Sequence, residues 1–290
     1  MQHCGKELRN TLISAARKTA GPSGEEYLSL PLEACKALSL KTGLNRKELE
    51  IAALEAEIIP ERYQRSMGTL GIDGQLKLLR SSVGILGAGG LGGFVVELLA
   101  RMGVGRLVIV DSDTFSESNL NRQLYSTENN LGQSKTDQAV ERVISVNEAV
   151  EAVGHSCRGS ADNLTDLFAG CDLAVDCLDN LPSRFALAEA CKKMEIIMVH
   201  GAIAGFLGQI AVVRPESAVL EALYGSSRES GLERGVETQL GNPAYTPAML
   251  ASWQAGETVK ILAGLDGVLP DGKMLMIDMQ SGESYAVDLF

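Results

Sequence analysis

Apolar runs of strand length alternate with helically spaced segments through the middle of the chain. Buried strands are predicted where the sequence is almost continuously apolar, at residues 83–86, 107–110, 152–154 and 173–176. Helical spacing of apolar residues begins near residues 91, 133 and 163. Strand, helix and strand in this order predict an α/β fold with a Rossmann-like parallel sheet, right-handed crossovers and ligands at the carboxyl ends of the strands.

The second half of the chain predicts a change of strand direction. A further buried strand is expected at 196–199, a more polar and antiparallel segment begins at 208–213, and 274–278 with 285–289 suggest a closing hairpin. Residues 215–245 are rich in Glu, Ser, Gly and Arg and lose periodicity, so a crossover loop over the active site is expected there. The predicted sheet is therefore parallel in its first half and mixed or antiparallel in its second.

The first 60 residues predict a small helical extension, followed by a main domain over 61–290. Residues 32–40 and 47–58 have helical spacing, Asn45 with Glu48 is typical of a capping box, and Pro60 ends the second segment. A helix pair could imitate half of a DNA-binding helix-turn-helix. Acidic residues balance its basic ones, however, which favours packing or a partner contact over DNA binding.

The composition is that of an ordinary globular protein with an acidic balance. Of the 290 residues, 45% are hydrophobic and 22% are charged, and the net charge is −11 at pH 7. A negative field repels nucleic acid, so no nucleic-acid binding is expected. The polar start lacks a signal-peptide core and no window holds 18 consecutive apolar residues, so we expect no membrane segment and a cytoplasmic location.

A glycine-rich turn follows the first strand of the predicted sheet. In Gly87-Ala88-Gly89-Gly90-Leu91-Gly92, Gly87 permits the turn, Gly89 lets the backbone approach a phosphate, and Gly92 lets helix and strand pack closely. The N-terminus of the following helix offers free N–H groups and the positive end of its dipole to an anion. Asp111, which ends the second strand, is placed to hydrogen-bond a ribose. These features predict a nucleotide site.

Polar residues after Asp111 indicate which nucleotide binds. Asn119, Arg122 and Lys135 return to the carboxyl edge of the sheet, where phosphates lie, and guanidinium and ammonium groups are common partners of phosphate oxygens. This pattern favours a triphosphate. An NAD-dependent oxidoreductase with the same turn remains an alternative, although no hydride-handling residue can be named, and a non-catalytic nucleotide-binding adaptor is a third reading.

With these motifs the chain resembles the ThiF/MoeB/HesA adenylyltransferases, relatives of the ubiquitin-activating enzymes. The matching pieces occur in the family's order and spacing over residues 61 to about 265. They are Glu61-Arg62-Tyr63-Gln64-Arg65, the turn from Gly87 to Gly92, residues 111–113, residues 118–123, Gly132-Gln133-Ser134-Lys135, Asp176-Cys177-Leu178-Asp179-Asn180 and residues 205–211.

The resemblance implies an activity and a set of site residues. The activity is ATP-dependent adenylation of the C-terminal glycine of a small ubiquitin-like sulfur carrier ending in Gly-Gly, of the thiamin or molybdopterin (or tungstopterin) type, with release of pyrophosphate. A homodimer is implied, in which Arg65 reaches the phosphates bound by the second subunit. The implied ATP-binding and catalytic residues are Gly87, Gly89, Gly90, Gly92, Asp111, Asn119, Arg122, Gln123 and Lys135, with Asp179 as the Mg²⁺ ligand.

Two departures from the family's pattern limit what the resemblance implies. Bacterial members often hold zinc with two C-x-x-C pairs, and the six cysteines here include no such pair, so no zinc is expected. Many members carry a cysteine in the crossover segment that links covalently to the carrier, and alignment of the last helix places Glu237 there. Adenylate formation without a thioester is therefore expected.

Several other reactive side chains are expected to be structural. Asp176 belongs to a strand pattern, and His200 has no partner at metal-ligand spacing. Cys171, Cys177 and Cys191 lie in strand or helix contexts, where cysteine acts as a small apolar residue. Asp179, besides its metal role, could also cap the helix that follows it.

Overall fold

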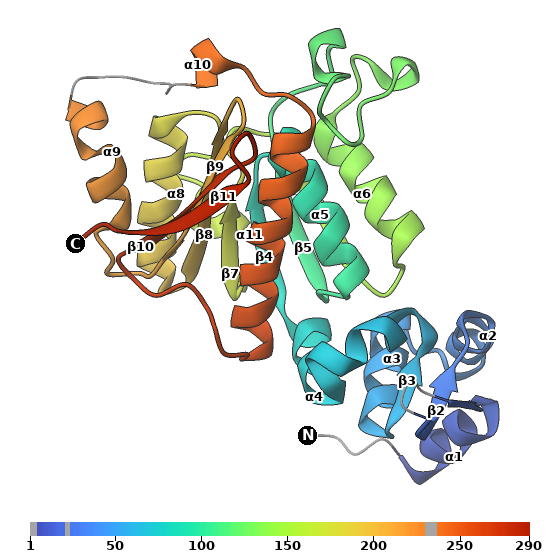
Figure 1. Ribbon diagram of the computed structural model, residues 1–290. Coiled ribbons are helices and arrows are strands. Elements are labelled where there is room, and N and C mark those ends of the chain that lie inside the picture. Colours follow the sequence, from blue (N-terminus) through green and yellow to red (C-terminus); the bar gives the residue numbers. More distant parts are fainter. Residues whose placement is uncertain (1–4, 21–23, 230–236) are drawn as a thin grey trace.

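An eight-stranded mixed sheet forms the centre of the molecule (Figure 1). The computed structural model describes residues 5–20, 24–229 and 237–290. The strands follow the order β11-β10-β9-β8-β7-β4-β5-β6 across the sheet. Their bounds are β4 Ser82–Leu86, β5 Arg106–Val110, β6 Glu151–His155, β7 Leu173–Asp176, β8 Ile197–Ala204, β9 Leu207–Val213, β10 Lys273–Asp278 and β11 Glu283–Asp288.

The sheet changes direction at β9, as the sequence predicted. Strands β4 to β8 are parallel, whereas β9, β10 and β11 each pair antiparallel with their neighbours. In the parallel part, Leu86 pairs with both Val110 and Asp176. Three strands therefore end at one level, and the residues that follow them, Gly87, Asp111 and Cys177, emerge side by side at the carboxyl edge.

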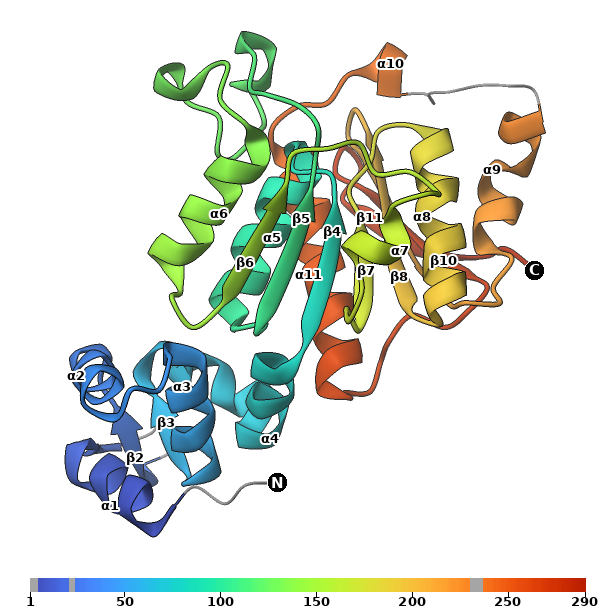
Figure 2. The ribbon, with the colours of Figure 1, turned by 180° about the vertical axis from the view of Figure 1, so that it is seen from behind.

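Helices cover both faces of this sheet (Figures 1 and 2). One apolar core joins the strands to α5 Gly90–Met102, α6 Lys135–Val146 and α11 Tyr245–Ala263, and a second joins them to α7 Leu164–Leu167, α8 Leu181–Met194 and α9 Val219–Glu229. Because β4 and β7 are buried on both faces, their sequences are largely apolar and do not alternate, apart from Ser82 at the start of β4 and Asp176 at the end of β7. Within the described ranges, no helix is both long and apolar enough to cross a membrane.

The N-terminal unit precedes the sheet and packs below its amino edge (Figure 1). It contains α1 Lys6–Ala15, β1 Arg17–Ala20, β2 Glu26–Leu30, α2 Leu32–Thr42, α3 Arg46–Glu55 and β3 Ile58–Pro60. The three strands form a separate small sheet in the order β1-β2-β3, and the unit has its own apolar core. After this unit, η1 Glu61–Ser66 and α4 Met67–Arg80 lead into β4. Three further short helices lie elsewhere in the chain: η2 Glu117–Asn119, η3 Glu128–Asn130 and α10 Glu237–Leu240.

The structure corrects two expectations about secondary structure. The N-terminal extension is not purely helical, because its apolar residues after Ala56 form β3 instead of continuing the helix to residue 58; the capping box of Asn45 and Glu48 is confirmed. The expected loop at 215–245 is wrong over Val219–Glu229, which is helix α9 and buries Val219 and Leu220 against the sheet. Residues 230–236 of that segment lie outside the described residues.

Candidate active site

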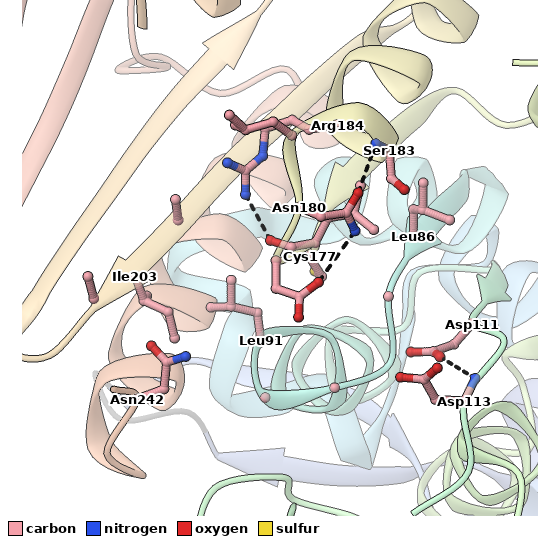
Figure 3. A pocket seen from close by; sticks show the side chains of 18 of the residues that line it. Leu86, Leu91, Asp111, Asp113, Cys177, Asn180, Ser183, Arg184, Ile203 and Asn242 are labelled. Carbon is pink, nitrogen blue, oxygen red and sulfur yellow. Dashed lines mark hydrogen bonds between the residues drawn. The ribbon is translucent and has the colours of Figure 1, made fainter. Parts of the chain in front are cut away.

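A cavity of about 720 Å³ opens at the carboxyl edge of the parallel strands (Figure 3). Its walls come from the glycine turn after β4, the loops after β5, β6 and β7, the start of α8, and the facing ends of β8 and β9. Of the predicted site residues, it brings together Gly87, Gly89, Gly90, Asp111, Arg122, Gln123, Lys135 and Asp179. Segments far apart in the sequence therefore meet in one chemical environment.

Two glycines of the turn, Gly87 and Gly92, are packed so closely that a side chain is excluded. Gly87 has φ +97°, and a Cβ there would lie 2.6 Å from the carbonyl oxygen of Cys177. A Cβ on Gly92 would lie 1.8 Å from the carbonyl oxygen of Gly87, so Gly92 packs the helix on the turn and does not line the cavity. Gly89 is the N-cap of α5 and makes no side-chain cap bond, so the first N–H groups of this helix point to the cavity edge as donors for an anion.

Asp111 connects the glycine turn to the loop after β5. Its Oδ2 accepts from the Ala88 N–H at 2.7 Å. Its Oδ1 accepts from the Asp113 N–H at 2.8 Å (Figure 3). Asp113 in turn accepts from Lys135 Nζ at 2.8 Å. Lys135 is almost fully buried whereas Asp113 is largely exposed, so the ammonium group is held at the cavity wall by a carboxylate that faces solvent.

Arg122 and Gln123 line the cavity from the loop that follows η2. Arg122 donates from one guanidinium nitrogen to the carbonyl of Ser118 and to Asn121 Oδ1, both at 3.0 Å. Gln123 is buried, and within the described chain its Oε1 has no hydrogen-bond partner. A buried acceptor without a partner in a cavity wall suits a ligand hydroxyl, a ligand N–H or a water molecule.

Asn119 stands behind this wall and does not line the cavity. Its Oδ1 accepts from the Ser116 N–H at 3.0 Å, and its carbonyl accepts from the N–H groups of Arg122 and Gln123. The residue is buried and shapes the loop that carries those two side chains. Its predicted contact with a phosphate remains a prediction.

Asp179 lines the cavity beside the N-terminus of α8. The cap of this helix is made by the next residue, Asn180, whose side-chain oxygen accepts from the Ser183 N–H at 3.0 Å (Figure 3). Asn180 Nδ2 lies 3.4 Å from Asp179 Oδ1. The capping alternative for Asp179 is therefore wrong, and its carboxylate is not needed for helix formation.

A buried charged network supports the loop that carries Asp179. Asp176, at the end of β7, has no exposed surface, and its Oδ2 accepts from Arg184 Nε at 2.8 Å and lies 2.7 Å from His200 Nδ1. Its Oδ1 accepts from the Leu178 N–H at 3.0 Å, and Arg184 also donates to the Leu178 carbonyl at 2.8 Å. Both polar groups of the Leu178 backbone are thus fixed directly before Asp179.

Burial and charge set the protonation of this network. Burial alone would raise the pKa of Asp176, but the Arg184 guanidinium and the hydrogen bonds from His200 and Leu178 together hold it below its usual value. Burial and the nearby Arg184 lower the pKa of His200, so this ring is neutral near pH 7. Its Nδ1–H then donates to Asp176, and its Nε2 accepts from the Tyr224 hydroxyl at 3.1 Å.

The structural roles predicted for Asp176 and His200 agree with these contacts, but the sequence analysis missed two residues. Arg184 and Tyr224 both line the cavity, and the Arg184 guanidinium carbon lies 5.2 Å from the centre of the Tyr224 ring. A signal was present for Arg184, which lies eight residues after Asp176, in the helix that begins after the Asp179 loop. Tyr224 was missed because it lies in the segment that its Glu, Ser, Gly and Arg content predicts to be a loop.

Burial keeps most of the described cysteines as protonated thiols. It raises the pKa of Cys35 and Cys191 to about 12, with nearby acidic groups adding to the effect. It also raises the pKa of Cys171 and Cys177. Cys157 differs, because it is partly exposed and lines the cavity.

The nucleotide site that the sequence predicts at the glycine turn implies that ATP should protect Cys157 from alkylation. Iodoacetamide should modify Cys157 in the free protein, and saturating ATP should slow the reaction severalfold because the nucleotide covers that wall. Peptide mass spectrometry over time measures the rate, with buried Cys191 as the internal control whose slow modification ATP leaves unchanged. Equal rates at Cys157 with and without bound ATP would place the nucleotide elsewhere.

Arg65 is the predicted site residue farthest from this cavity in the fold. It is exposed in η1, which packs against α4 and β3 at the edge where β4 begins. The cavity lies where β4 ends, and a strand of that length spans about 16 Å. A contact between Arg65 and a nucleotide would therefore have to occur in another copy of the chain.

Comparisons with known proteins identify the relatives of this chain. The ThiF family matches residues 63–288. The chain is 35% identical over 220 residues to the SAMP-activating enzyme E1 of Haloferax volcanii, covering 75% of this chain and 81% of that protein. It is 33% identical over 271 residues to the adenylyltransferase and sulfurtransferase MOCS3 of Mus musculus, covering 92% of this chain and 55% of that protein. The chain thus spans about half the length of the MOCS3 relatives.

Solved structures share the fold at lower identity. PaaA superposes with a TM-score of 0.66 at 20% identity, covering 79% of this chain and 82% of that chain. MccB of E. coli, solved with succinimide, gives a TM-score of 0.68 at 18% identity, covering 88% of this chain and 82% of that chain. The family match extends over more than three quarters of the sequence and contains every residue that lines the cavity. The chain therefore belongs to the ThiF family.

Proposed function

We propose that this chain is an adenylyltransferase that activates the C-terminal glycine of a small ubiquitin-like sulfur carrier with ATP and releases pyrophosphate. The observation that carries the proposal is the cavity, in which the glycine turn, Asp111, Arg122, Lys135 and Asp179 surround one continuous space. The names of the relatives, a SAMP-activating enzyme and an adenylyltransferase and sulfurtransferase, support the same activity.

The reaction needs position and charge stabilisation more than acid–base chemistry. The carboxylate of the carrier is already ionised at neutral pH; its oxygen bonds to the α-phosphorus of ATP while the bond from that phosphorus to the bridging oxygen breaks. Pyrophosphate leaves with the electron pair. Asp111 would accept from the ribose, while the N-terminus of α5, Arg122 and Lys135 would donate to phosphate oxygens.

Lys135 must change partner to take this role. In the structure its ammonium is paired with Asp113, 2.8 Å away, and Asp113 is largely exposed. Because Asp113 is largely exposed, water can solvate its carboxylate once a phosphate, which carries more negative charge, takes its place beside the buried Lys135. The ion pair thus keeps Lys135 at the cavity wall until a nucleotide arrives.

Asp179 suits a Mg²⁺ site in which the nucleotide supplies most of the ligands. Mg²⁺ is usually held by one or two carboxylates together with substrate phosphates and waters. In the part of the chain that is described, no three His, Cys, Asp or Glu side chains gather as a preformed metal site. Asp179 would therefore be the main protein ligand, and the ion would offset charge on the departing pyrophosphate.

The remainder of the cavity suits an extended Gly-Gly tail. It continues along facing residues of β8 and β9, including Ala202, Ala204 and Gly208, and reaches Met276 on β10. A Cβ on Gly208 would lie 3.0 Å from Met249 and 3.1 Å from Leu250, so this wall is already closely packed. The small residues Ala202, Ala204 and Gly208 on this wall favour a tail without side chains.

The proposal extends to assembly and to the fate of the product. The enzyme works as a cytoplasmic homodimer with residues 1–60 and 61–290 as its two domains, and Arg65 acts on the phosphates in the partner. The acyl adenylate passes to an external sulfur donor or nucleophile, because Glu237 stands where many family members carry the linking cysteine. Burial also raises the pKa of Cys35, Cys171, Cys177 and Cys191 away from the thiolate range, whereas Cys157 is partly exposed and lines the cavity.

Exchange of labelled pyrophosphate into ATP tests the proposed reaction. Purified carriers of the thiamin and molybdopterin types should each be tried, and at least one should support exchange that depends on Mg²⁺. The matched control is the same carrier without its terminal glycine, which should support none. A folded, ATP-binding protein that shows no exchange with any Gly-Gly carrier would behave as an oxidoreductase or an adaptor would, and the proposal would fall.

A further inference from the structure

A buried carboxylate of the N-terminal unit contacts the segment that carries Arg65. Glu50, in α3, has no exposed surface, and its Oε2 accepts from the Tyr63 hydroxyl at 2.9 Å. The Nε of Arg62 lies 3.4 Å from Oε1 of the same carboxylate. Two consecutive residues of η1 therefore depend on one side chain from the N-terminal unit.

The main domain contacts the same two residues. Asn147, directly after α6, donates from Nδ2 to the Tyr63 hydroxyl and to the Ala100 carbonyl, both at 3.0 Å. Arg62 donates to Asn147 Oδ1 and also lies 3.5 Å from the Val146 carbonyl. Tyr63 and Asn147 are each 1% exposed, so this junction is shielded from water and the contacts compete with little solvent.

The start of η1 is fixed as well. Strand β3 runs directly into Glu61, and Glu61 forms an ion pair with Arg17 of β1 and accepts from Ser29 Oγ of β2 at 3.3 Å. The first three residues of η1 are therefore held by the N-terminal sheet, by α3 and by the end of α6. Arg65 follows two residues later with an exposed side chain.

We propose that the N-terminal unit is a positioning element for Arg65. Through Glu50 and Tyr63 it fixes the backbone of η1, so that Arg65 is presented in one orientation to the active site of the partner subunit. This inference rests on the proposed function, in which Arg65 acts on phosphates bound by a second copy. Fixing the segment in advance removes conformational freedom that would otherwise be lost at the transition state, and small displacements of such a group are costly to the rate.

Tyr63→Phe separates positioning from general stability. The change removes the hydroxyl shared by Glu50 and Asn147 but keeps the ring that packs against Leu54 and Leu79. Differently tagged chains, purified as heterodimers, allow the change to be placed on either side of one active site. In the parent heterodimer one chain carries Asp179→Asn and the other Arg65→Ala, so the single complete site combines Arg65 of the first chain with Asp179 of the second.

The expected result depends on which chain of the heterodimer carries Tyr63→Phe. Placed in the Asp179→Asn chain, which donates Arg65, it should lower kcat for pyrophosphate exchange about tenfold with little change in the KM for ATP. Placed in the Arg65→Ala chain, it should leave the exchange rate of the parent heterodimer nearly unchanged, although its effect on thermal stability is the same. Equal losses in both arrangements would show a structural role alone and would overturn the inference.

One further variant and two outcomes of the exchange assay distinguish the possible failures. Glu50→Gln, which keeps the shape and the acceptor for Tyr63 but removes the charge facing Arg62, should show the same asymmetry if Tyr63→Phe chains fold poorly. Exchange by the wild-type homodimer without any exchange by the parent heterodimer would overturn the inference by removing the action of Arg65 in the partner. Absence of exchange by the wild type itself would remove the proposed function.

Discussion

Asp179→Asn should lower carrier-dependent pyrophosphate exchange by about a hundredfold or more, while the thermal unfolding temperature stays almost unchanged. Asp179 lines the cavity, but the cap of α8 is made by Asn180, so the helix does not need the carboxylate. The amide keeps the shape of the side chain and loses the charge that would hold Mg²⁺. Exchange assays over a range of Mg²⁺ concentrations, beside a thermal melt, measure both effects.

A neighbouring carboxylate provides the matched control. Asp166, in α7, is exposed and does not line the cavity, so Asp166→Asn removes the same charge without touching the site. It should exchange pyrophosphate at the wild-type rate. The metal role of Asp179 would be refuted by a well-folded Asp179→Asn protein with near-normal exchange and an unchanged Mg²⁺ requirement.

Mixed chains carrying Arg65→Ala and Asp179→Asn, each inactive alone, should regain activity when they exchange subunits. In the mixed dimer one site takes an intact Arg65 from one chain and an intact Asp179 from the other, because η1 lies at the opposite edge of the sheet from the cavity of its own chain. Recovery should approach half of the wild-type rate per dimer. Exchange assays on the tag-purified heterodimer measure it.

The double variant gives the complementary result. In this heterodimer one chain carries both Arg65→Ala and Asp179→Asn, and the other chain is wild type. If Arg65 acts in the partner subunit, one site lacks Arg65 and the other lacks Asp179, so the heterodimer should be inactive. If Arg65 instead acts within its own chain, the wild-type chain keeps a complete site, and the heterodimer should show half of the rate of the wild-type dimer. Arg9→Ala, an exposed change on α1, is the control that should not affect either mixture.

The predicted and observed sheets agree where local pattern and tertiary burial coincide. The strands predicted at residues 83–86, 107–110 and 173–176 lie within a residue of their true bounds because both of their faces are buried, which makes the sequence almost continuously apolar. The glycine turn can be recognised from the sequence for a related reason. Only glycine fits where the backbone of Gly87 meets Cys177 and where Gly92 meets Gly87.

Prediction failed where a segment depends on contacts with distant residues. Helix α9 has an amphipathic pattern, but the Glu, Ser, Gly and Arg residues in and around it favoured a loop, and Val219 and Leu220 become core residues because β9 lies beside them. The strands of the N-terminal unit are short, and they form because β2 pairs with β1 on one side and with β3 on the other. Pairing energy of this kind is absent from any single window of sequence.

The sequence by itself determined the order of strands and helices in the parallel half of the sheet, the phosphate-binding turn and the residue types available for nucleotide chemistry, because each is encoded within a few neighbouring positions. The tertiary structure alone decided which of those residues share a space. It brought Asp179 and Lys135 to one cavity, moved Asn119 behind the wall, and enclosed Arg184 with Asp176 and His200. It also set Arg65 at the other edge of the sheet, since parallel strands place their two ends on opposite sides of the molecule.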